Sequence, residues 1–415
     1  MKVVHFVGGY LASGAGRAAE IIHLGLQADG IDSTILTGDP KPATNAKGIV
    51  SLDNGGLARV TGMAYKAGEQ LTKKIAARGK PVSLYSPGLF GHRIPRQVRD
   101  ADIVHLHWLN TAAFVPPFVE KLSVPTVWTL HDMWPMTGGC HYALDCRRFE
   151  TTCGACPRLS SSRERDLSTF LQARLKRRVG GKVHVAAISE WIALEARASA
   201  VLRECPITVI PNAVDTKAYF PVDRRLARTA LGLDPDRPIV LTGHASNGWL
   251  KGSDLIVDAV DSLRTSAAAP DFDLIGFGTL DQEIGARYAH HYGRVYDDVT
   301  LRLLYSAADV FVAASRYEAF GRTLIEAMAC GTPVASFRGT GPDDIIVPGQ
   351  TGELAEAGNG SDLGAGIARL LGTGGALRDN CRNRAETVYA RQTIAAQYQS
   401  LYRTALTGAG SPPSR

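Results

Sequence analysis

Short runs of apolar residues alternate with helical patterns along the whole chain, and this alternation restricts the folds that the chain can adopt. The runs are continuously apolar, which is typical of parallel strands covered by helices on both faces. The strands predicted in this way are residues 3–7, 33–37, 102–107, 126–131, 184–189, 207–211, 238–243, 271–278, 309–315 and 333–337. Helical patterns lie between them, for example at residues 253–263 and 322–330. Repeated strand–helix alternation predicts a doubly wound α/β architecture.

The length of 415 residues exceeds what one ordinary hydrophobic core accommodates. A composition of 45% hydrophobic and 21% charged residues is that of a globular protein. We therefore expect two α/β domains, residues 1–210 and 221–388, joined by a linker at residues 211–220. Open α/β sheets bind ligands beyond the carboxyl ends of their strands, so the site is expected in a cleft between these domains. Residues 407–415 are expected to form a disordered tail.

Charge is divided unevenly between the two halves. Residues 1–210 carry 26 basic and 17 acidic side chains, a balance of +9, whereas the remainder has a balance of −3. This excess predicts an anionic partner for the first domain. Basic residues recur at every seventh position of one helical pattern, at Arg59, Lys66, Lys73 and Lys80. The stripe is either a solvated face or a patch that contacts anionic lipid, and no recognition motif favours nucleic acid.

The sequence also bears on the compartment. No apolar run approaches the roughly 18–20 residues that cross a bilayer. Residues 1–14 are too short and too glycine-rich for a secretory signal, so we expect a cytoplasmic chain, peripheral at the inner face of the membrane if the basic stripe contacts lipid. Thiols stay reduced in the cytoplasm, which favours a metal or no bond at all over disulfides.

Four of the seven cysteines fall within 17 residues, at Cys140, Cys146, Cys153 and Cys156. Only Cys153-x2-Cys156 has the usual spacing of a zinc knuckle. All four thiols could ligate one zinc ion without an open position, which would make the site structural rather than catalytic. The alternative is four thiols with no metal.

The stretch EAFGRTLIEAMACGTPV begins at Glu318 and follows a predicted strand. Residues 320–323 are expected to form the first turn of a helix, whose backbone N–H groups suit a phosphate or diphosphate. Glu326 lies eight residues after Glu318, about 12 Å along the axis if both were on one helix. That exceeds the roughly 5–9.5 Å between the paired carboxylates of glycoside hydrolases. A long ligand with a glutamate at each end fits better, and an ordinary helix start with two exposed glutamates is the alternative.

The first domain offers weaker signals. Gly14 and Gly16 lie in the loop after the first strand, but Ala19 occupies the third glycine position of G-x-G-x-x-G, which disfavours a nicotinamide enzyme. His131 ends a predicted strand and is either a structural hydrogen-bonding residue or a site residue, and Asp132 could orient either the loop or the ring. We expect His105 and His107 to point to opposite faces of their strand and therefore not to share a metal.

Taken with other segments, the Glu318 stretch resembles the E-x7-E signature of retaining, nucleotide-sugar-dependent glycosyltransferases of the GT-B fold, family four. Nearly the whole chain resembles this family in the expected order, at residues 13–36, 102–108, 129–142, 209–221 and 378–406. The resemblance implies two Rossmann-like domains that face each other across a cleft. It also implies a closing helix at residues 389–406 that crosses back to the first domain.

The resemblance assigns roles to individual residues. Glu326 would hold the ribose hydroxyls of the nucleotide, Glu318 and His131 would contact the donor sugar, and Lys251 would neutralise the diphosphate. Catalytic roles thus fall to His131, Glu318 and Lys251. The binding residues implied are Gly14, Gly16, Lys251, Phe320, Gly321, Arg322, Thr323 and Glu326. Many relatives carry an arginine shortly before the lysine. Here His244, Ser246 and Asn247 occupy that region, which leaves Arg322 as a candidate substitute.

The implied function is transfer of a hexose from a UDP- or GDP-sugar to a lipid-linked oligosaccharide in exopolysaccharide or capsule biosynthesis. The polysaccharide role comes from the subfamily that the cysteine-rich stretch resembles. No cofactor is required for catalysis, and a structural zinc is the one metal considered. Two alternatives remain open, a sugar-nucleotide epimerase or phosphorylase of the same fold, and a non-catalytic zinc-stapled scaffold or nucleic-acid binder.

Overall fold

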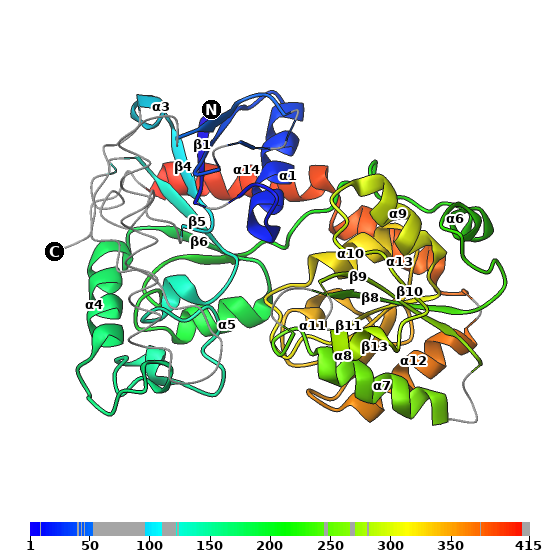
Figure 1. Ribbon diagram of the computed structural model, residues 1–415. Helices are drawn as coiled ribbons and strands as arrows, with labels where there is room; N and C mark the ends of the chain where they lie inside the picture. The colour runs from blue at the N-terminus through cyan, green and yellow to red at the C-terminus, as the bar shows by residue number, and fades with distance from the viewer. Residues whose placement is uncertain are drawn as a thin grey trace. The chain divides into compact units, whose positions relative to one another are not determined.

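The computed structural model describes residues 1–8, 10–39, 41–42, 44, 46–52, 96–109, 122, 124–244, 248–265, 270–279, 282–373 and 375–408 (Figure 1). The chain divides into two compact units, Met1–Pro211 with Ile394–Arg415, and Asn212–Thr393. Each unit is a parallel sheet with helices around it, so the predicted pair of doubly wound α/β domains is confirmed. The basic stripe at residues 57–80 and residues 409–415 lie outside the described residues.

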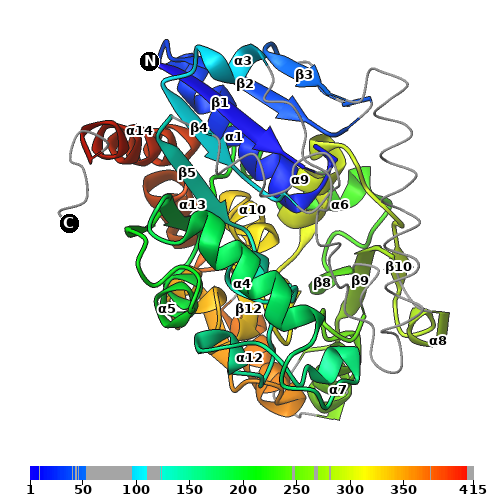
Figure 2. The same cartoon turned by 90° about the vertical axis from the view of Figure 1, so that its left-hand side faces the viewer.

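The first unit contains a seven-stranded parallel sheet of order β3-β2-β1-β4-β5-β6-β7. Its strands are β1 (Lys2–Val7), β2 (Asp32–Thr37), β3 (Ile49–Ser51), β4 (Ile103–Leu106), β5 (Thr126–Leu130), β6 (His184–Ala187) and β7 (Ile207–Val209). β1, β4 and β5 lie side by side at the centre of this sheet (Figure 2). Their residues are almost entirely buried, as the continuously apolar runs predict.

The helices of the first unit begin with well-defined caps. Ser13 caps the first helix, and Asp166 and Thr169 form a capping box at α4. The helices are α1 (Gly14–Ala28), α3 (Arg96–Arg99), α4 (Leu167–Val179) and α5 (Glu190–Ala198). Three short 3₁₀ helices, η2 (Trp134–Met136), η3 (Arg148–Glu150) and η4 (Pro157–Leu159), lie between β5 and α4.

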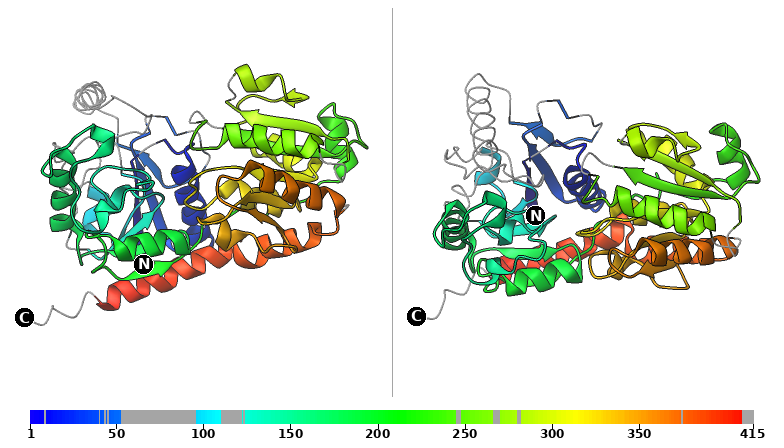
Figure 3. Two further views of the ribbon diagram at one scale, coloured as in Figure 1. Left: turned by 90° about the horizontal axis from the view of Figure 1, so that it is seen from below. Right: turned by 60° about the horizontal axis from the view of Figure 1, so that its bottom comes forward.

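The last helix, α14 (Arg391–Gly408), begins in the second unit and belongs to the first from Ile394 onward. It runs along the sheet of the first unit (Figure 3). The hydroxyl of Tyr402 lies 2.7 Å from His105 Nδ1 on β4, and the hydroxyl of Tyr398 lies 2.9 Å from Thr129 Oγ1 on β5. Both tyrosines are buried, so hydrogen bonds as well as apolar packing hold α14 to the sheet.

The second unit contains a six-stranded parallel sheet of order β10-β9-β8-β11-β12-β13. Its strands are β8 (Ile239–His244), β9 (Asp273–Gly278), β10 (His290–His291), β11 (Val310–Ala313), β12 (Val334–Phe337) and β13 (Gly352–Ala355). Its other helices are α6 (Arg224–Ala230), α7 (Ser253–Thr265), α8 (Gln282–Gly285), α9 (Asp298–Ala307), α10 (Arg322–Ala329), α11 (Pro342–Ile345), α12 (Gly360–Gly372) and α13 (Arg378–Val388). In Figure 1, α7 and α12 cover one face of this sheet and α9, α10 and α13 the other.

The core of the second unit lies between the sheet and the pair α7 and α12. Val240, Val310 and Ala335 from the strands pack with Ile256 and Ile367 from these helices. All ten predicted strands overlap observed strands, and the structure adds β3, β10 and β13 at or near the sheet edges. Among the described residues, no helix combines the length and the apolar character needed to cross a bilayer.

Candidate active site

Two loops that follow neighbouring strands of the second unit bring Lys251 and Glu318 together. The Nζ atom of Lys251 donates a hydrogen bond of 2.6 Å to Oε2 of Glu318. The hydroxyl of Ser315 donates to the same oxygen at 3.2 Å, and the backbone carbonyl of Glu318 accepts from the Gly341 N–H at 2.9 Å. The sequence indicated both charged residues but gave no reason to expect that they form an ion pair.

A close backbone contact positions Lys251. The next residue, Gly252, has φ of +66°, and a Cβ atom there would lie 1.8 Å from the carbonyl oxygen of Ala314. Only glycine allows this approach of the loop after β8 to the loop after β11. The Arg316 N–H donates to the Leu250 carbonyl at 2.9 Å, so backbone contacts fix the Lys251 loop against the Glu318 loop.

The helix after Glu318 begins later than predicted. Residues 320–323 were expected to form its first turn, but α10 begins at Arg322 and Thr323 is its second residue. Gly321 has φ of +107°, a left-handed conformation that cannot continue a right-handed helix. Phe320 is buried with its ring edge-on to Tyr389, so its side chain is part of the core. The first N–H groups of a helix have no acceptor within it, and this helix end therefore suits an anion.

Glu326 is a buried carboxylate on α10 that accepts from two neighbouring side chains. It is 7% exposed, and it accepts from Arg322 at 2.8 Å through Oε1 and from the Tyr305 hydroxyl at 3.2 Å through Oε2. Burial, and then the charge of Glu326, raise the pKa of Tyr305 well above its usual value, so the phenol remains a donor. A carboxylate has about four acceptor sites, so one carboxylate can serve several donors at once.

The two glutamates of the signature thus have separate partners. Glu318 lies in the loop before α10, so the axial distance expected for two glutamates on one helix does not apply. Glu318 pairs with Lys251, whereas Glu326 pairs with Arg322. Of the residues considered for the missing arginine, Ser246 and Asn247 and the His244 side chain lie outside the described structure.

In the first unit, a chain of three histidines ends at His131, which directly follows β5. The Nδ1 atom of His107 lies 3.1 Å from Nε2 of His131, and Nδ1 of His5 lies 3.1 Å from Nε2 of His107. Both His5 and His107 are fully buried, and Nε2 of His5 has no hydrogen-bond partner among the described residues. The sequence gave no indication of this chain, because it joins residues from three strands.

The chain of hydrogen bonds fixes the tautomer of His131. Burial, and then the neighbouring histidines, lower the pKa of His5 and His107 well below the usual value, so both rings are neutral and carry one N–H each. A buried N–H without an acceptor is rarer than an acceptor without a donor, which places the His5 hydrogen on Nδ1. His5 then donates to His107, and His107 donates to Nε2 of His131. The hydrogen of a neutral His131 is therefore on Nδ1.

The expectation that His105 and His107 point to opposite faces is wrong. Alternate residues of a strand share a face, and the two ring centroids lie 4.1 Å apart. His5, His105 and His107 have potential ligand atoms within 4.8 Å of one another. The rings of His5 and His107 are stacked, however, with 23° between their planes, and these two rings already share a hydrogen bond. Both nitrogens of His105 also have hydrogen-bond partners, Tyr402 and Thr129. The cluster is a hydrogen-bonded core rather than a metal site.

Asp132 is held as a buried carboxylate beside this chain. It accepts from His141 at 2.5 Å, from the Trp108 indole at 2.9 Å and from the Trp134 N–H at 2.9 Å. Burial alone would raise the pKa of Asp132, but these contacts, with His141 the largest, hold it below the usual value. Asp132 therefore orients the loop that begins at His131, through its bonds to Trp134 and His141.

The glycine loop after β1 is positioned by backbone packing. A Cβ atom at Gly16 would lie 2.5 Å from the Tyr10 carbonyl oxygen, whereas the space around Gly14 is open to 4 Å. The Leu11 N–H donates to Asp39 at 3.1 Å, which ties this loop to the end of β2. Gly16 is thus required for packing, and Gly14 is the position at which a ligand can approach the backbone.

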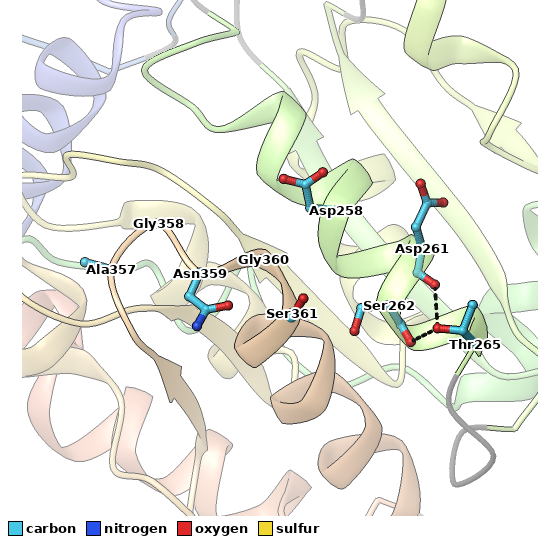
Figure 4. Close-up of a pocket in the computed structure, with 9 residues that line it drawn as sticks. All are labelled: Asp258, Asp261, Ser262, Thr265, Ala357, Gly358, Asn359, Gly360 and Ser361. Carbon is cyan, nitrogen blue, oxygen red and sulfur yellow. Dashed lines mark hydrogen bonds between the residues drawn. The ribbon is translucent and has the colours of Figure 1, made fainter.

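Two cavities in the described part of the chain lie away from the residues discussed above. An open cavity of about 750 Å³ lies between α7 and the start of α12, and none of the predicted site residues lines it (Figure 4). The four clustered cysteines line a smaller cavity in the first unit.

Two family profiles match the chain. The family described as Glycosyltransferase Family 4 matches residues 12–218, and the family described as Glycosyl transferases group 1 matches residues 223–388. Together they include all the candidate residues of both units.

Curated relatives match over part of the chain. An MMP alpha-(1->4)-mannosyltransferase from Mycolicibacterium hassiacum is 29% identical over 206 residues, 48% of this chain and 48% of the relative. A lipopolysaccharide core biosynthesis mannosyltransferase from Rhizobium meliloti is 34% identical over 182 residues, 40% of this chain and 50% of the relative. The matched region thus spans about half the length of these relatives.

Solved structures match over nearly the whole chain and show the fold. Sucrose-phosphate synthase from Thermosynechococcus elongatus superimposes with a TM-score of 0.68 at 20% identity, covering 98% of this chain and all of that one. HepE from Anabaena, in complex with UDP and glucose, superimposes with a TM-score of 0.62 at 16% identity, covering 97% of this chain and all of that one.

Proposed function

The chain belongs to glycosyltransferase family four and has the GT-B fold, and from this premise we propose that it transfers a hexose from a UDP- or GDP-sugar, with retention of configuration, to a lipid-linked oligosaccharide. The observation that carries the proposal is the pairing of Lys251 with Glu318 in the loop that leads into α10. A cation, a carboxylate and a helix N-terminus on adjoining loops suit a sugar joined to a diphosphate.

Glu326 would bind the nucleotide. Its position on α10, eight residues after Glu318, allows it to accept hydrogen bonds from the ribose diol while Tyr305 and Arg322 hold the carboxylate in place. Because Glu326 is almost fully buried, a ligand that reaches it loses its water and gains strong charge-assisted bonds.

Lys251 and the N-terminus of α10 would bind the diphosphate. In the reaction the bond between the anomeric carbon and the diphosphate oxygen breaks, and the nucleoside diphosphate leaves with the electron pair. A preorganised cation stabilises the charge that grows on the leaving oxygen. Lys251 therefore exchanges its bond to Glu318 for a bond to phosphate as the donor binds.

Glu318 and His131 would contact the donor sugar. We assign no nucleophile, because retention in this proposal follows from attack on the face that the leaving group departs from. The acceptor oxygen bonds to the anomeric carbon, and its proton passes to the departing phosphate oxygen. The protein chiefly positions the reactants and stabilises charge. The Nδ1–H tautomer of His131 supplies a hydrogen-bond donor.

Two observations bear on the identity of the acceptor. One curated relative is named for lipopolysaccharide core biosynthesis, and residues 1–210 carry a balance of +9. Both favour an anionic, lipid-linked acceptor in exopolysaccharide or capsule assembly, reached by a chain located at the inner face of the membrane.

The test is a panel of UDP- and GDP-sugars, screened by thermal shift and by release of nucleoside diphosphate. One donor should raise the melting temperature and be consumed. The anomeric configuration of the product, read by NMR, then tests retention. A panel with no stabilising donor overturns the transferase proposal, and a donor that changes into another nucleotide sugar without an acceptor shows an epimerase. Glu326→Gln should lose the stabilisation by that donor. Glu353→Gln is the matched control, because Glu353 is a partly exposed carboxylate of the same unit that pairs with Arg369.

A further inference from the structure

Residues 131–166 form a long loop between β5 and α4 that contains only three short 3₁₀ helices. Loops of this length without helices or strands are uncommon in compact domains, because little hydrogen bonding within the segment stabilises them. The order of such a loop requires another source of stability.

The four clustered cysteines surround one cavity in this loop. Cys140, Cys146, Cys153 and Cys156 all line it, and its volume is about 20 Å³. A cavity of that size holds one water molecule or one ion. From this arrangement we propose that the four thiols bind a single structural Zn²⁺ ion, a metal that thiolates select and that accepts four protein ligands in a tetrahedron.

The backbone of the cysteines is already anchored on both sides of the cavity. The Cys153 N–H donates to Gln172 at 2.6 Å and the Cys156 N–H donates to Asp166 at 2.9 Å, both residues of the α4 region. The Cys140 N–H donates to the Thr137 hydroxyl at 2.8 Å. No three of the four sulfurs lie within 4.8 Å of one another in the described structure. A Zn–S bond of about 2.3 Å places tetrahedral sulfurs about 3.8 Å apart, so binding of the ion would draw the sulfurs inward.

The loop also concentrates unusual backbone conformations. Among the described residues, the non-glycine residues with positive φ are Leu144, Ala155 and Ser160, and all three lie in this loop. Ala155 lies inside the Cys153-x2-Cys156 knuckle. Each such conformation carries a cost that persists only where the surroundings impose it. Four metal–thiolate bonds would impose it here.

Positive charge at the cavity matches a tetrathiolate, which carries two negative charges with its zinc. Arg148 lines the cavity, and the charge of Arg158 acts on the Cys140 thiol. Nε of Arg148 and one terminal nitrogen of Arg158 are buried without a hydrogen-bond partner in the described structure. A Cβ atom added at Gly138 would lie 3.0 Å from the Cβ atom of Cys153, so this backbone lies close to the thiol. Donors such as the two arginine nitrogens stabilise metal-bound sulfur.

The four cysteines are free thiols, so none of them is occupied by a disulfide and each can serve as a metal ligand. The site has no open position and takes no part in sugar transfer, so it stands or falls independently of the proposed function.

The first experiment measures metal in the wild-type protein, purified without chelator from cells grown with added zinc. We expect about one zinc per chain by elemental analysis. Exchange with Co²⁺ alone should give the intense absorption of a tetrahedral thiolate site. A chain with less than a tenth of a zinc and no such absorption overturns the proposal, as does a disulfide among the four cysteines found by mass spectrometry.

Variants locate the ion. Cys153→Ser and Cys156→Ser should each lower the zinc content at least severalfold. Cys381→Ala removes a buried thiol of the other unit and should leave the zinc content unchanged. Equal zinc in all three variants contradicts the assignment. Because the serine variants can fail to fold, the wild-type melting temperature is also measured with and without a chelator. A fall on chelation that zinc restores supports the site.

Discussion

The ammonium of Lys251 lies 2.6 Å from a carboxylate oxygen of Glu318, so the two residues with proposed catalytic roles in the second unit neutralise each other. The Lys251 side chain is 34% exposed, and ion pairs near the surface contribute only about 0–1 kcal/mol. Under the proposed function, a diphosphate with a larger charge would displace Glu318 from Lys251 at little cost. The displaced carboxylate would then be available to the hydroxyls of the sugar.

Replacement of Lys251 should mainly affect turnover. Lys251→Met removes the cation that stabilises the leaving diphosphate, and we expect kcat to fall about 100- to 1000-fold. Steady-state release of the nucleoside diphosphate measures the effect. Lys217→Met changes an exposed lysine of the same unit and should retain activity. A Lys251→Met variant with normal kcat would rule out the diphosphate role.

Replacement of Glu326 should mainly affect nucleotide binding. Glu326→Gln keeps the shape but removes the charge, and bonds to charged groups contribute about 1.5–3 kcal/mol. We therefore expect the dissociation constant for UDP or GDP to rise about 10- to 150-fold, measured by calorimetry. Glu353→Gln should leave it unchanged. Unchanged affinity in Glu326→Gln refutes the ribose contact.

Stability should fall in mild acid because buried histidines have lowered pKa values, and His5, His105 and His107 form the largest group of them. The pKa values of His5, His105 and His107 are lowered by burial first and by neighbouring histidines second. Their unfolded forms take up protons below the ordinary value of 6.5, whereas the folded forms do not. The stabilising effect is therefore complete above pH 6.5 and is lost as the pH falls. Each histidine adds a slope of up to about 1.4 kcal/mol per pH unit.

Urea unfolding between pH 5 and pH 8 measures this slope. His5→Phe should reduce the slope by up to about 1.4 kcal/mol per pH unit, even if it lowers stability at every pH. His290→Phe replaces an exposed histidine and serves as the control. An identical slope in His5→Phe and in the wild type would show that His5 is protonated in the folded protein.

His107 should control the tautomer of His131. In His107→Phe the donor to Nε2 is lost, and ¹⁵N spectra of labelled histidine should show the hydrogen of His131 shared between its two nitrogens. We expect kcat to fall about tenfold with little change in KM, whereas His107→Gln, which retains a donor, should recover part of the activity. Spectra that match the wild type would contradict the hydrogen-bond order described for the chain.

The anchor of α14 can be tested at one hydroxyl. Tyr402→Phe removes the partner of His105 Nδ1, and a buried group left without a partner costs about 1–3 kcal/mol. Thermal or urea unfolding measures the loss. Ser400→Ala changes an exposed residue of the same helix and should cost less. Equal losses would show that the hydroxyl contributes nothing specific.

The predicted strands were found because interior strands of parallel sheets are continuously apolar. The strands missed have only two to four residues and lie at or next to the sheet edges, as at His290–His291 and Gly352–Ala355. The helix after Glu318 was predicted two residues early at Phe320, because the left-handed conformation of Gly321 depends on tertiary contacts.

The site residues were predicted unevenly for a similar reason. Glu318 and Glu326 are close in sequence, so their spacing could be recognised. His5, His107 and His131 come from β1, the end of β4 and the end of β5, and no local pattern joins them. Alternate residues of a strand share a face, so the spacing of His105 and His107 in the sequence does indicate that these two rings are neighbours.

The contact between Gly252 and Ala314 has a consequence for protein engineering. The alignment of the two loops depends on backbone atoms, since no side chain fits between them. Position 252 therefore has to remain glycine in any library that varies the side chains of these two loops.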